Sequence, residues 1–373
     1  MKSTALFALL LAAAMVAADR SEKPLVAHEW GTFTSVAGAD GTPVEWAPLV
    51  GPPDLPCFVY TTKRLQPKDA IRGRVRMETP VLYFYAQAPT TLSVDVDFPQ
   101  GQITEWYPQS STPVDLRTGL PHSMKWPDVE VLPGAHLTLP TGRGASHYYA
   151  ARSTDSAPLR IANQPEKMIF YRGVGFFDVP LRARINAEGK LVVRNAGEET
   201  IPLVIAFESQ GGKLGYRIAR GLKGKTKFNL LDIPELTGDL GALQQTLATE
   251  LVEFGLYPRE AAAMIETWRD SWFEDGMRVF YIVPREQVDA ILPLKIAPEP
   301  TSAERVFVGR VEVLSPRTKQ TIDNAMKAGD SAALIKMGRF LRPFAQQMGR
   351  MADLAGLEQA ILAPFFDSAV CVL

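Results

Sequence analysis

Acidic and basic side chains gather between Glu266 and Glu274, in a segment where apolar residues recur at helical spacing. Glu266 and Asp270 are four residues apart, so on a helix their like charges repel unless Arg269 or a bound group relieves them. Neighbouring carboxylates whose pKa values are driven apart carry out general acid and base catalysis. Asp270 and Glu274 are therefore candidate acid and base residues, and Arg269 is a candidate holder of an anionic group. The alternative is an ordinary solvated helix face.

His28 and Glu29 add an imidazole and a carboxylate near the N-terminal end of the chain. On a strand, adjacent side chains point to opposite faces, so only one of the two faces a given site. The hypothesis of a catalytic site between the two halves of the chain then has five members. They are His28, Glu29, Arg269, Asp270 and Glu274.

Recognised motifs for metal or nucleophilic chemistry are missing from the sequence. There is no His-Glu-x-x-His and no Cys-x-x-Cys spacing, so neither a metal nor another cofactor is predicted. There is also no Gly-x-Ser-x-Gly nucleophile elbow. The four histidines are expected to be surface or hydrogen-bonded structural residues, and a metal site assembled from distant histidines is the alternative.

Four tryptophans lie in the first half of the chain, at positions 30, 46, 106 and 126. Exposed indole rings on a β-sandwich are suited to stacking against the apolar faces of sugar rings. Tryptophans are more often buried in or near the core. The aromatic residues therefore leave two interpretations open, a platform for a glycan or a set of core residues.

The first eighteen residues have the pattern of a cleavable secretion signal. Lys2 supplies a basic head, an uncharged apolar run follows from Ala5 to Ala17, and Ala18 closes a small-residue cleavage site. The run is shorter than the roughly 20 apolar residues that span a bilayer. We therefore expect residues 1–18 to be removed, and the mature protein to be soluble and periplasmic or secreted, without membrane insertion.

The composition narrows the class of partner. The chain has 40 Lys and Arg against 41 Asp and Glu, without a basic stripe, so a nucleic acid is not the expected partner. The expected partner is a glycan or a protein of the cell envelope.

Cys57 and Cys371 are the only cysteines. In an oxidising compartment they could pair, and a buried free thiol at Cys57 is the other interpretation that the residues leave open.

Short β-like runs separated by Pro, Gly, Asn and Asp fill residues 19–231. Many such runs with frequent turns predict an antiparallel β-sandwich. Residues 107–140 are rich in proline and are expected to form a long loop. The runs 190–194 and 201–207 are expected to pair as a hairpin or meander.

Helical spacing begins after position 231. It predicts one helix that starts after Asp239 and stops at Gly255, and a second that starts at Pro258. Residues 305–313 are expected to form a strand with a bulge at Gly309, because the apolar phase slips there. Region 232–373 is thus predicted to be mixed α/β with a helical end. Together the two regions give an α+β fold class with two expected domains.

Three segments together resemble an uncharacterised family of exported bacterial proteins. They are His28 to Ser35 (HEWGTFTS), Met77 to Pro80 (METP) and Trp268 to Glu274 (WRDSWFE). The likeness covers most of the mature chain and implies export and a bacterial origin. It implies no activity, cofactor or catalytic residue.

The sequence therefore favours an exported, soluble binding or structural component of the bacterial cell envelope. The alternative is a hydrolase directed at the envelope that uses the carboxylate acid and base residues. The residues alone do not decide whether the protein is an enzyme.

Overall fold

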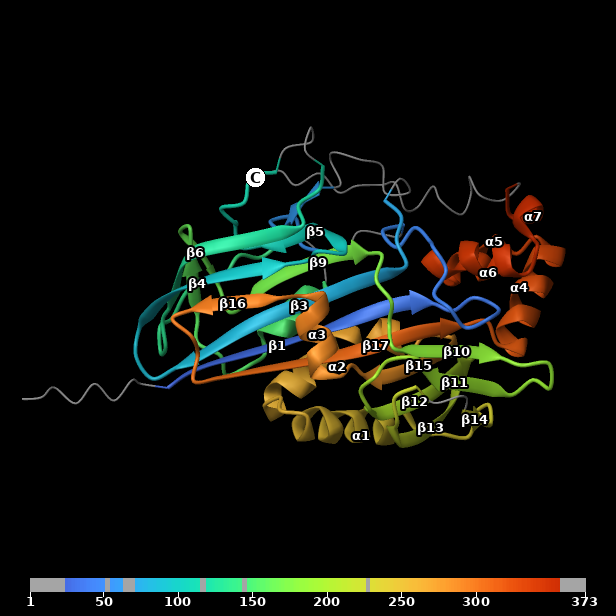
Figure 1. The fold of residues 1–373 in the computed structure, drawn as a ribbon. Coiled ribbons are helices and arrows are strands. Elements are labelled where there is room, and N and C mark those ends of the chain that lie inside the picture. The colour runs from blue at the N-terminus through green and yellow to red at the C-terminus, as the bar shows by residue number, and fades with distance from the viewer. Residues whose placement is uncertain are drawn as a thin grey trace, which may run out of the picture.

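The computed structural model describes residues 24–50, 54–62, 71–114, 119–142, 146–225 and 229–355. The chain has an α+β fold, as predicted, with sheets formed mainly by its N-terminal part and helices at its C-terminal end (Figure 1). The predicted signal, residues 1–18, lies outside the described residues. Cys57 is disulfide-bonded, which excludes the buried free thiol, and Cys371 also lies outside the described residues. Within the described ranges, no helix is long and apolar enough to cross a membrane.

Three sheets contain the strands. The largest has nine strands, in the spatial order β13 (Lys213–Leu222), β12 (Ile201–Gln210), β15 (Gly276–Ile282), β17 (Ser302–Val313), β1 (Leu25–Val36), β3 (Val75–Ala86), β9 (Ile169–Gly175), β5 (Gly101–Tyr107) and β2 (Tyr60–Thr61). A five-stranded sheet has the order β16 (Leu294–Ala297), β4 (Thr90–Asp97), β6 (Ser123–Val131), β7 (Leu159–Ile161) and β8 (Gln164–Glu166). The third sheet is β10 (Leu181–Ile185), β11 (Leu191–Asn195) and β14 (Asn229–Leu231).

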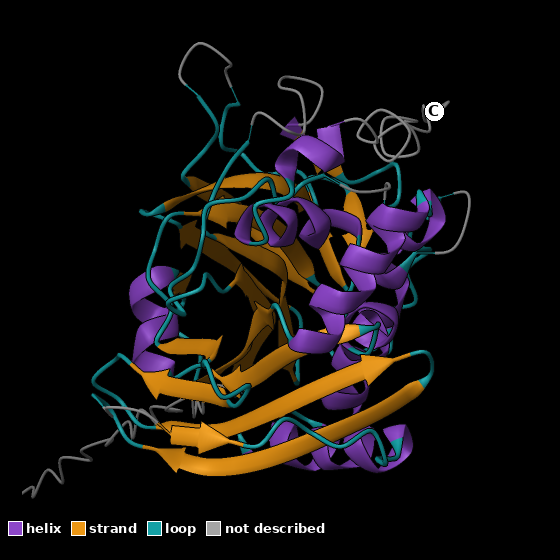
Figure 2. Ribbon diagram, turned by 90° about the vertical axis from the view of Figure 1, so that its right-hand side faces the viewer, coloured by secondary structure: helices purple, strands orange, loops and turns teal. Residues whose placement is uncertain are grey.

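The helices lie outside these sheets (Figure 2). They are the 3₁₀ helix η2 (His147–Arg152), α1 (Leu240–Glu253), α2 (Pro258–Trp272), α3 (Arg285–Ile291), α4 (Pro316–Ala328), α5 (Ser331–Lys336), the 3₁₀ helix η3 (Gly338–Phe340), α6 (Leu341–Gln347) and α7 (Met351–Ala355). α1, α2 and η2 pack with one face of the nine-stranded sheet, while α4 to α7 form a separate small core around Trp46.

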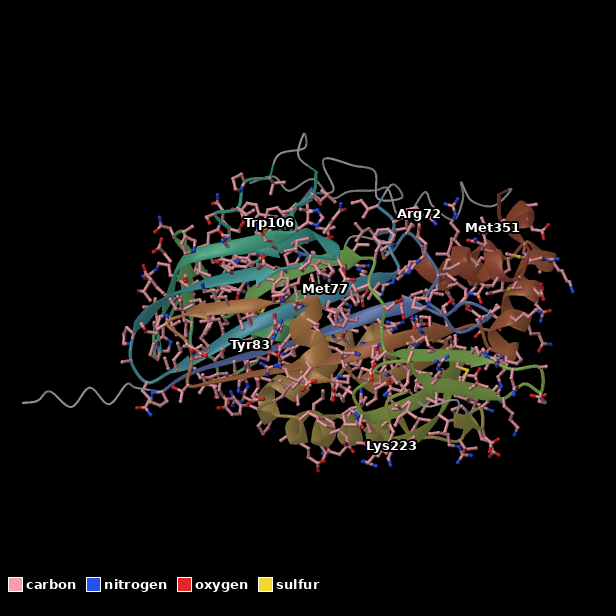
Figure 3. All side chains as sticks on the ribbon, in the orientation of Figure 1. Arg72, Met77, Tyr83, Trp106, Lys223 and Met351 are labelled. Atoms are coloured by element: carbon pink, nitrogen blue, oxygen red, sulfur yellow. The ribbon has the colours of Figure 1, made fainter. Side chains whose placement is uncertain are left out.

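Both faces of the nine-stranded sheet are buried, and strand alternation divides its side chains between two cores. In β1, Ala27 and Phe33 point into the core shared with the two smaller sheets, whereas Trp30 points toward α1 and α2. β3 divides in the same way, with Met77 in the first core and Tyr83 in the second (both labelled in Figure 3). The large sheet is therefore the central layer of the molecule.

The central pair of strands joins the two ends of the chain. β1 pairs in parallel with β17, from Val26 opposite Ser302 to Val36 opposite Glu312. β15, the neighbour of β17, also comes from the C-terminal region. Strands from both regions that the sequence distinguishes thus lie side by side in one sheet.

The predicted bulge at Gly309 is wrong. β17 keeps an unbroken register with β1 and with β15 through this residue. The apolar phase slips because both faces of β17 are covered: Val308 faces the helices and Val311 faces the other sheets. Arg310 and Glu312 continue the helix-facing row of β17 and are buried. Because they are charged, the sequence alone makes this face of the strand look exposed to solvent at these two positions.

Two further predictions about the β-rich region are wrong. The expected loop 107–140 contains β6, whose Trp126 is fully buried in the core between the sheets. The expected pairing of 190–194 with 201–207 does not form, because β11 pairs with β10 and β14 while β12 pairs with β13 and β15. The sequence of a short strand does not indicate which other strand it pairs with when several segments have similar patterns.

The predicted helix pair is confirmed. Asp239 caps α1, where its side chain accepts a hydrogen bond from the Ala242 N–H at 2.7 Å. Gly255 ends the turn after α1 with φ +112°, a conformation that a residue with a Cβ rarely adopts. α2 then begins at Pro258 and packs against α1 in the core around Trp30.

Candidate functional site

The five sequence-predicted residues do not face a common space. His28 is 2% exposed and faces α2, where its Nδ1 lies 2.7 Å from Glu260 Oε2. Glu29 is fully buried on the opposite face of β1, where its carboxylate accepts a hydrogen bond from Arg305 Nε at 2.6 Å. The expected separation of the two side chains by the strand is thus observed, and Glu29 belongs to the core between the sheets.

The other three residues lie along and beyond α2. The side chains of Arg269 and Asp270 are 53% and 62% exposed and form ion pairs with exposed neighbours. Glu274 follows the end of α2 and binds the buried Arg310 at 2.8 Å. Glu274 lies about 20 Å along the helix direction from Glu260, the residue that contacts His28. The five predicted residues therefore lie in four separate places: His28 against α2, Glu29 in the core between the sheets, Arg269 and Asp270 on a solvated face, and Glu274 in an ion pair with Arg310.

The tryptophans proposed as a glycan platform are core residues. Trp30, Trp46 and Trp126 are at most 2% exposed, and Trp106 is 7% exposed. Their rings pack against Tyr83, Phe340 and other buried groups. These indoles offer no exposed face on which a sugar could stack.

His28 and Glu260 form a buried, hydrogen-bonded imidazole–carboxylate pair, which has the geometry of an acid and base pair. Because a carboxylate only accepts, the hydrogen bond places a proton on His28 Nδ1. Glu260 also accepts hydrogen bonds from the Tyr85 hydroxyl and the Tyr257 backbone N–H, each at 2.8 Å. Burial and the adjacent Glu260 charge raise the pKa of Tyr85, so its hydroxyl stays protonated as a donor.

A histidine oriented by a carboxylate is the arrangement of a general base. Here the imidazole is enclosed, because its ring centroid lies 4.4 Å from that of Tyr257 and 5.4 Å from that of Tyr85. Tyr257 is 41% exposed and lies on the outer side. The cluster therefore serves in this structure to fasten the first turn of α2 to β1.

A band of buried charges crosses five adjacent strands on the helix-facing side of the large sheet. Arg278 on β15 and Arg310 on β17 both bind Glu312 Oε1, at 2.9 and 2.6 Å. Beyond β1, Glu78 on β3 accepts a hydrogen bond from Thr34 and pairs with Arg339 at 2.5 Å. On β9, Arg172 binds Thr79 and Asp54. Each buried charge in this band has an opposite charge within reach, as burial requires.

The buried charges of the band shift one another's pKa values. Burial alone would raise the pKa of Glu78, but Arg339 and Arg76 outweigh it and hold the pKa below its usual value. Burial likewise opposes ionisation of Glu312, and Arg278 and Arg310 again hold its pKa low. Burial lowers the pKa of Arg339 to about 10, which leaves it charged at neutral pH. All these groups are ionised together, so the band is a charge-paired structural layer.

An open site of a different kind lies on the outer face of the β10–β11 hairpin. Arg182 and Arg184 on β10 and Arg194 on β11 line a depression of about 610 Å³. The loop that follows β1, from Ala39 to Thr42, forms its other wall. The volume is in the range of small-ligand sites, roughly 300 to 1,000 Å³.

Strand alternation explains why the arginines point outward. Leu181 and Ala183 on β10, with Leu191 and Val193 on β11, are buried in the core between the sheets. The residues between them, Arg182 and Arg184, must then lie on the other face. Register places Arg194 directly opposite Arg182.

The facing loop is held in a compact turn. Asp40 accepts hydrogen bonds from the Thr42 N–H at 2.9 Å and the Thr42 hydroxyl at 2.6 Å, and these bonds lower the pKa of Asp40. Gly41 has φ +87°, and a Cβ there would approach the Ala183 carbonyl oxygen to 3.3 Å. The one carboxylate that lines the depression is therefore ionised, and the charge of Arg182 lowers its pKa further.

Arg182 and Arg194 differ in how far the surrounding residues neutralise them. Arg182 Nη2 donates to the exposed Asp178 at 3.1 Å, while its Nη1 is buried and has no hydrogen-bond partner. The Arg194 side chain is exposed and makes no ion pair within the described ranges. Like charges directly across a strand pair are destabilising. An anion between Arg182 and Arg194 would relieve this repulsion.

Sequence reasoning missed Glu260 and the three arginines. Glu260 is 232 residues from His28, and nothing local marks their contact. The arginines do carry a signal, since Leu181-Arg182-Ala183-Arg184-Ile185 alternates with period two. In the part of the chain that the structure describes, no three His, Cys, Asp or Glu side chains are grouped to hold a metal ion.

Comparison with protein-family models and with curated proteins gave no match to this chain.

Replacing Glu260 by alanine should lower the free energy of unfolding by about 3 kcal/mol, because His28, Tyr85 and the Tyr257 N–H all lose a buried acceptor. Urea unfolding measures this. Glu266→Ala is the matched control on the exposed side of the same helix, with an expected change within about 0.5 kcal/mol. Equal effects of the two substitutions would contradict the assigned role of Glu260.

Stability should fall as the pH drops below about 4.5, the ordinary pKa of a glutamate. Glu78 and Glu312 have lowered pKa values in the folded state, so their contribution is complete above the unfolded-state pKa. It is lost as the pH falls through their folded-state values. Each should contribute a slope of up to about 1.4 kcal/mol per pH unit in the free energy of unfolding.

Urea unfolding between pH 6 and pH 3 measures that slope. Glu130→Gln, at an exposed ion pair with Arg160, is the control and should leave the slope unchanged. A free energy of unfolding that stays constant down to pH 3 would show that the band is not ionised as described.

Proposed function

We propose that this protein is an exported binding component of the bacterial cell envelope that recognises an acidic envelope glycan through the arginine depression on the β10–β11 hairpin. The residue pattern of positions 1–18 supports export. The depression supports binding of an anion. The proposal assigns no reaction to the protein.

One observation carries the proposal: Arg182 and Arg194 lie directly opposite each other on the outer face of the hairpin. Two guanidinium groups in this arrangement repel each other in the free protein and are well placed to hold one carboxylate, sulfate or phosphate group between them.

The lining favours a glycan over a protein partner. Besides the arginines and Asp40, it consists largely of small residues such as Ala39, Gly41, Ala183 and Ala196. Protein interfaces depend on large apolar and aromatic anchors that fill pockets. A concave surface with arginine donors and small side chains suits a polar ring that carries an acidic group.

The alternative of a hydrolase that uses carboxylates has less support. His28 and Glu29 lie on opposite faces of β1, and Asp270 is solvated on α2. Glu274 is engaged with Arg310 in the charge band. No feature of the described residues brings these groups to one substrate.

Titration calorimetry with digalacturonate, an acidic disaccharide, tests the proposal. The purified protein should bind it, and Arg182→Ala and Arg194→Ala should each weaken binding about tenfold or more, because each removes a charge-assisted hydrogen bond. Affinity should also fall with added salt, since the contacts are ionic and partly exposed.

Maltose is the neutral ligand control and should not bind. Arg160→Ala is the matched protein control, because it removes an exposed arginine from the separate five-stranded sheet. Binding of digalacturonate that is equally tight in the Arg182 and Arg194 variants would reject the site. Failure of the unaltered protein to bind any acidic saccharide would reject the function.

A further inference from the structure

The arginine depression has a neighbour that shares two of its lining residues. A second hollow, of about 410 Å³, is also lined by Ala39 and Arg184. It continues past the tip of the β10–β11 hairpin to the start of α4, where Lys319 lines it. In Figure 1 the hairpin, the end of β1 and α4 lie at the same end of the molecule.

Basic side chains recur along the two hollows. Arg194 and Arg182 lie in the first, Arg184 lines both, and Lys319 lies in the second. Arg182 and Arg184 are about 7 Å apart along their strand, given the rise of a β-strand. Lys319 is exposed, and its side chain makes no ion pair with the residues that the structure describes. Positive charge therefore continues beyond the first site.

The position of the two hollows follows from the parallel pairing of β1 and β17. Carboxyl ends of parallel neighbours lie at the same edge of a sheet, and ligands commonly bind outside such ends. The loop after β1 forms a wall of both hollows. The second hollow is also lined by Val313 at the end of β17 and by Leu314, Ser315, Pro316 and Lys319 after it. The Gln347 side chain donates to the Ala37 carbonyl at 2.8 Å and ties α6 to the same loop.

We infer that the two hollows form one groove for an acidic oligosaccharide chain, with one acidic group near Arg182 and Arg194 and the next near Lys319. This inference rests on the proposed function and specifies its ligand as a chain with acidic groups on successive sugars. A single acidic sugar occupies the first hollow alone. Longer chains gain the contact with Lys319.

The test compares galacturonate oligomers from one to six units by titration calorimetry. Affinity of the unaltered protein should rise about fivefold or more between the monomer and the tetramer, and then level off once the groove is filled. Lys319→Ala should weaken tetramer binding about fivefold and leave monomer binding unchanged. Arg194→Ala should weaken both. Arg160→Ala, with its exposed side chain elsewhere, should alter neither.

The outcomes separate this inference from the proposed function. If the monomer and the tetramer bind equally well and Lys319→Ala has no effect, the groove is rejected while the anion site at Arg182 and Arg194 stands. If no oligomer binds, both are rejected. Melting temperatures of the variants within about 2 °C of the unaltered protein would show that these surface substitutions leave the fold intact.

Discussion

The parallel pairing of β1 with β17 is the interaction on which the rest of the structure depends. It joins residues from the two ends of the chain at the centre of the nine-stranded sheet. On the face toward the smaller sheets, Glu29 and Arg305 form a buried ion pair directly across the two strands. On the helix side, the charge band crosses the same pair between Glu312 and Glu78. Because a buried charge is stable only beside its partner, these contacts oppose any shift of register.

That constraint also creates the surface that we assign to ligand binding. Parallel strands end at the same edge, so the loop after β1 and the segment after β17 meet there. The β10–β11 hairpin packs its apolar face into the sheet core nearby and leaves Arg182, Arg184 and Arg194 outside. The compact turn at Asp40 and Gly41 then forms the opposite wall. Burial of the apolar face thus determines which side chains line the depression.

The sequence predicts local features better than pairings. The cap at Asp239, the stop at Gly255 and the start of α2 at Pro258 depend on neighbouring residues only, and all three are confirmed. Strand partners depend on distant segments, so the place of β17 beside β1 is not visible in its own residues. The same limit explains the bulge wrongly expected at Gly309, since the covering of both faces of β17 comes from elsewhere in the chain.

The same distinction applies to the sites. The sequence singles out His28, but the partner that orients it, Glu260, is placed by the tertiary fold. The outward arginines follow from a local alternation in β10, whereas the wall that makes them a depression comes from the loop after β1.

The most direct measurement of the central claim is the NMR signal of the arginine side chains. During titration with tetragalacturonate, the Nε–Hε resonances of Arg182 and Arg194 should shift with one common saturation curve, while that of Arg160 stays in place. Arginine resonances of the hairpin that do not move at saturating ligand, or shifts confined to α2, would contradict this account.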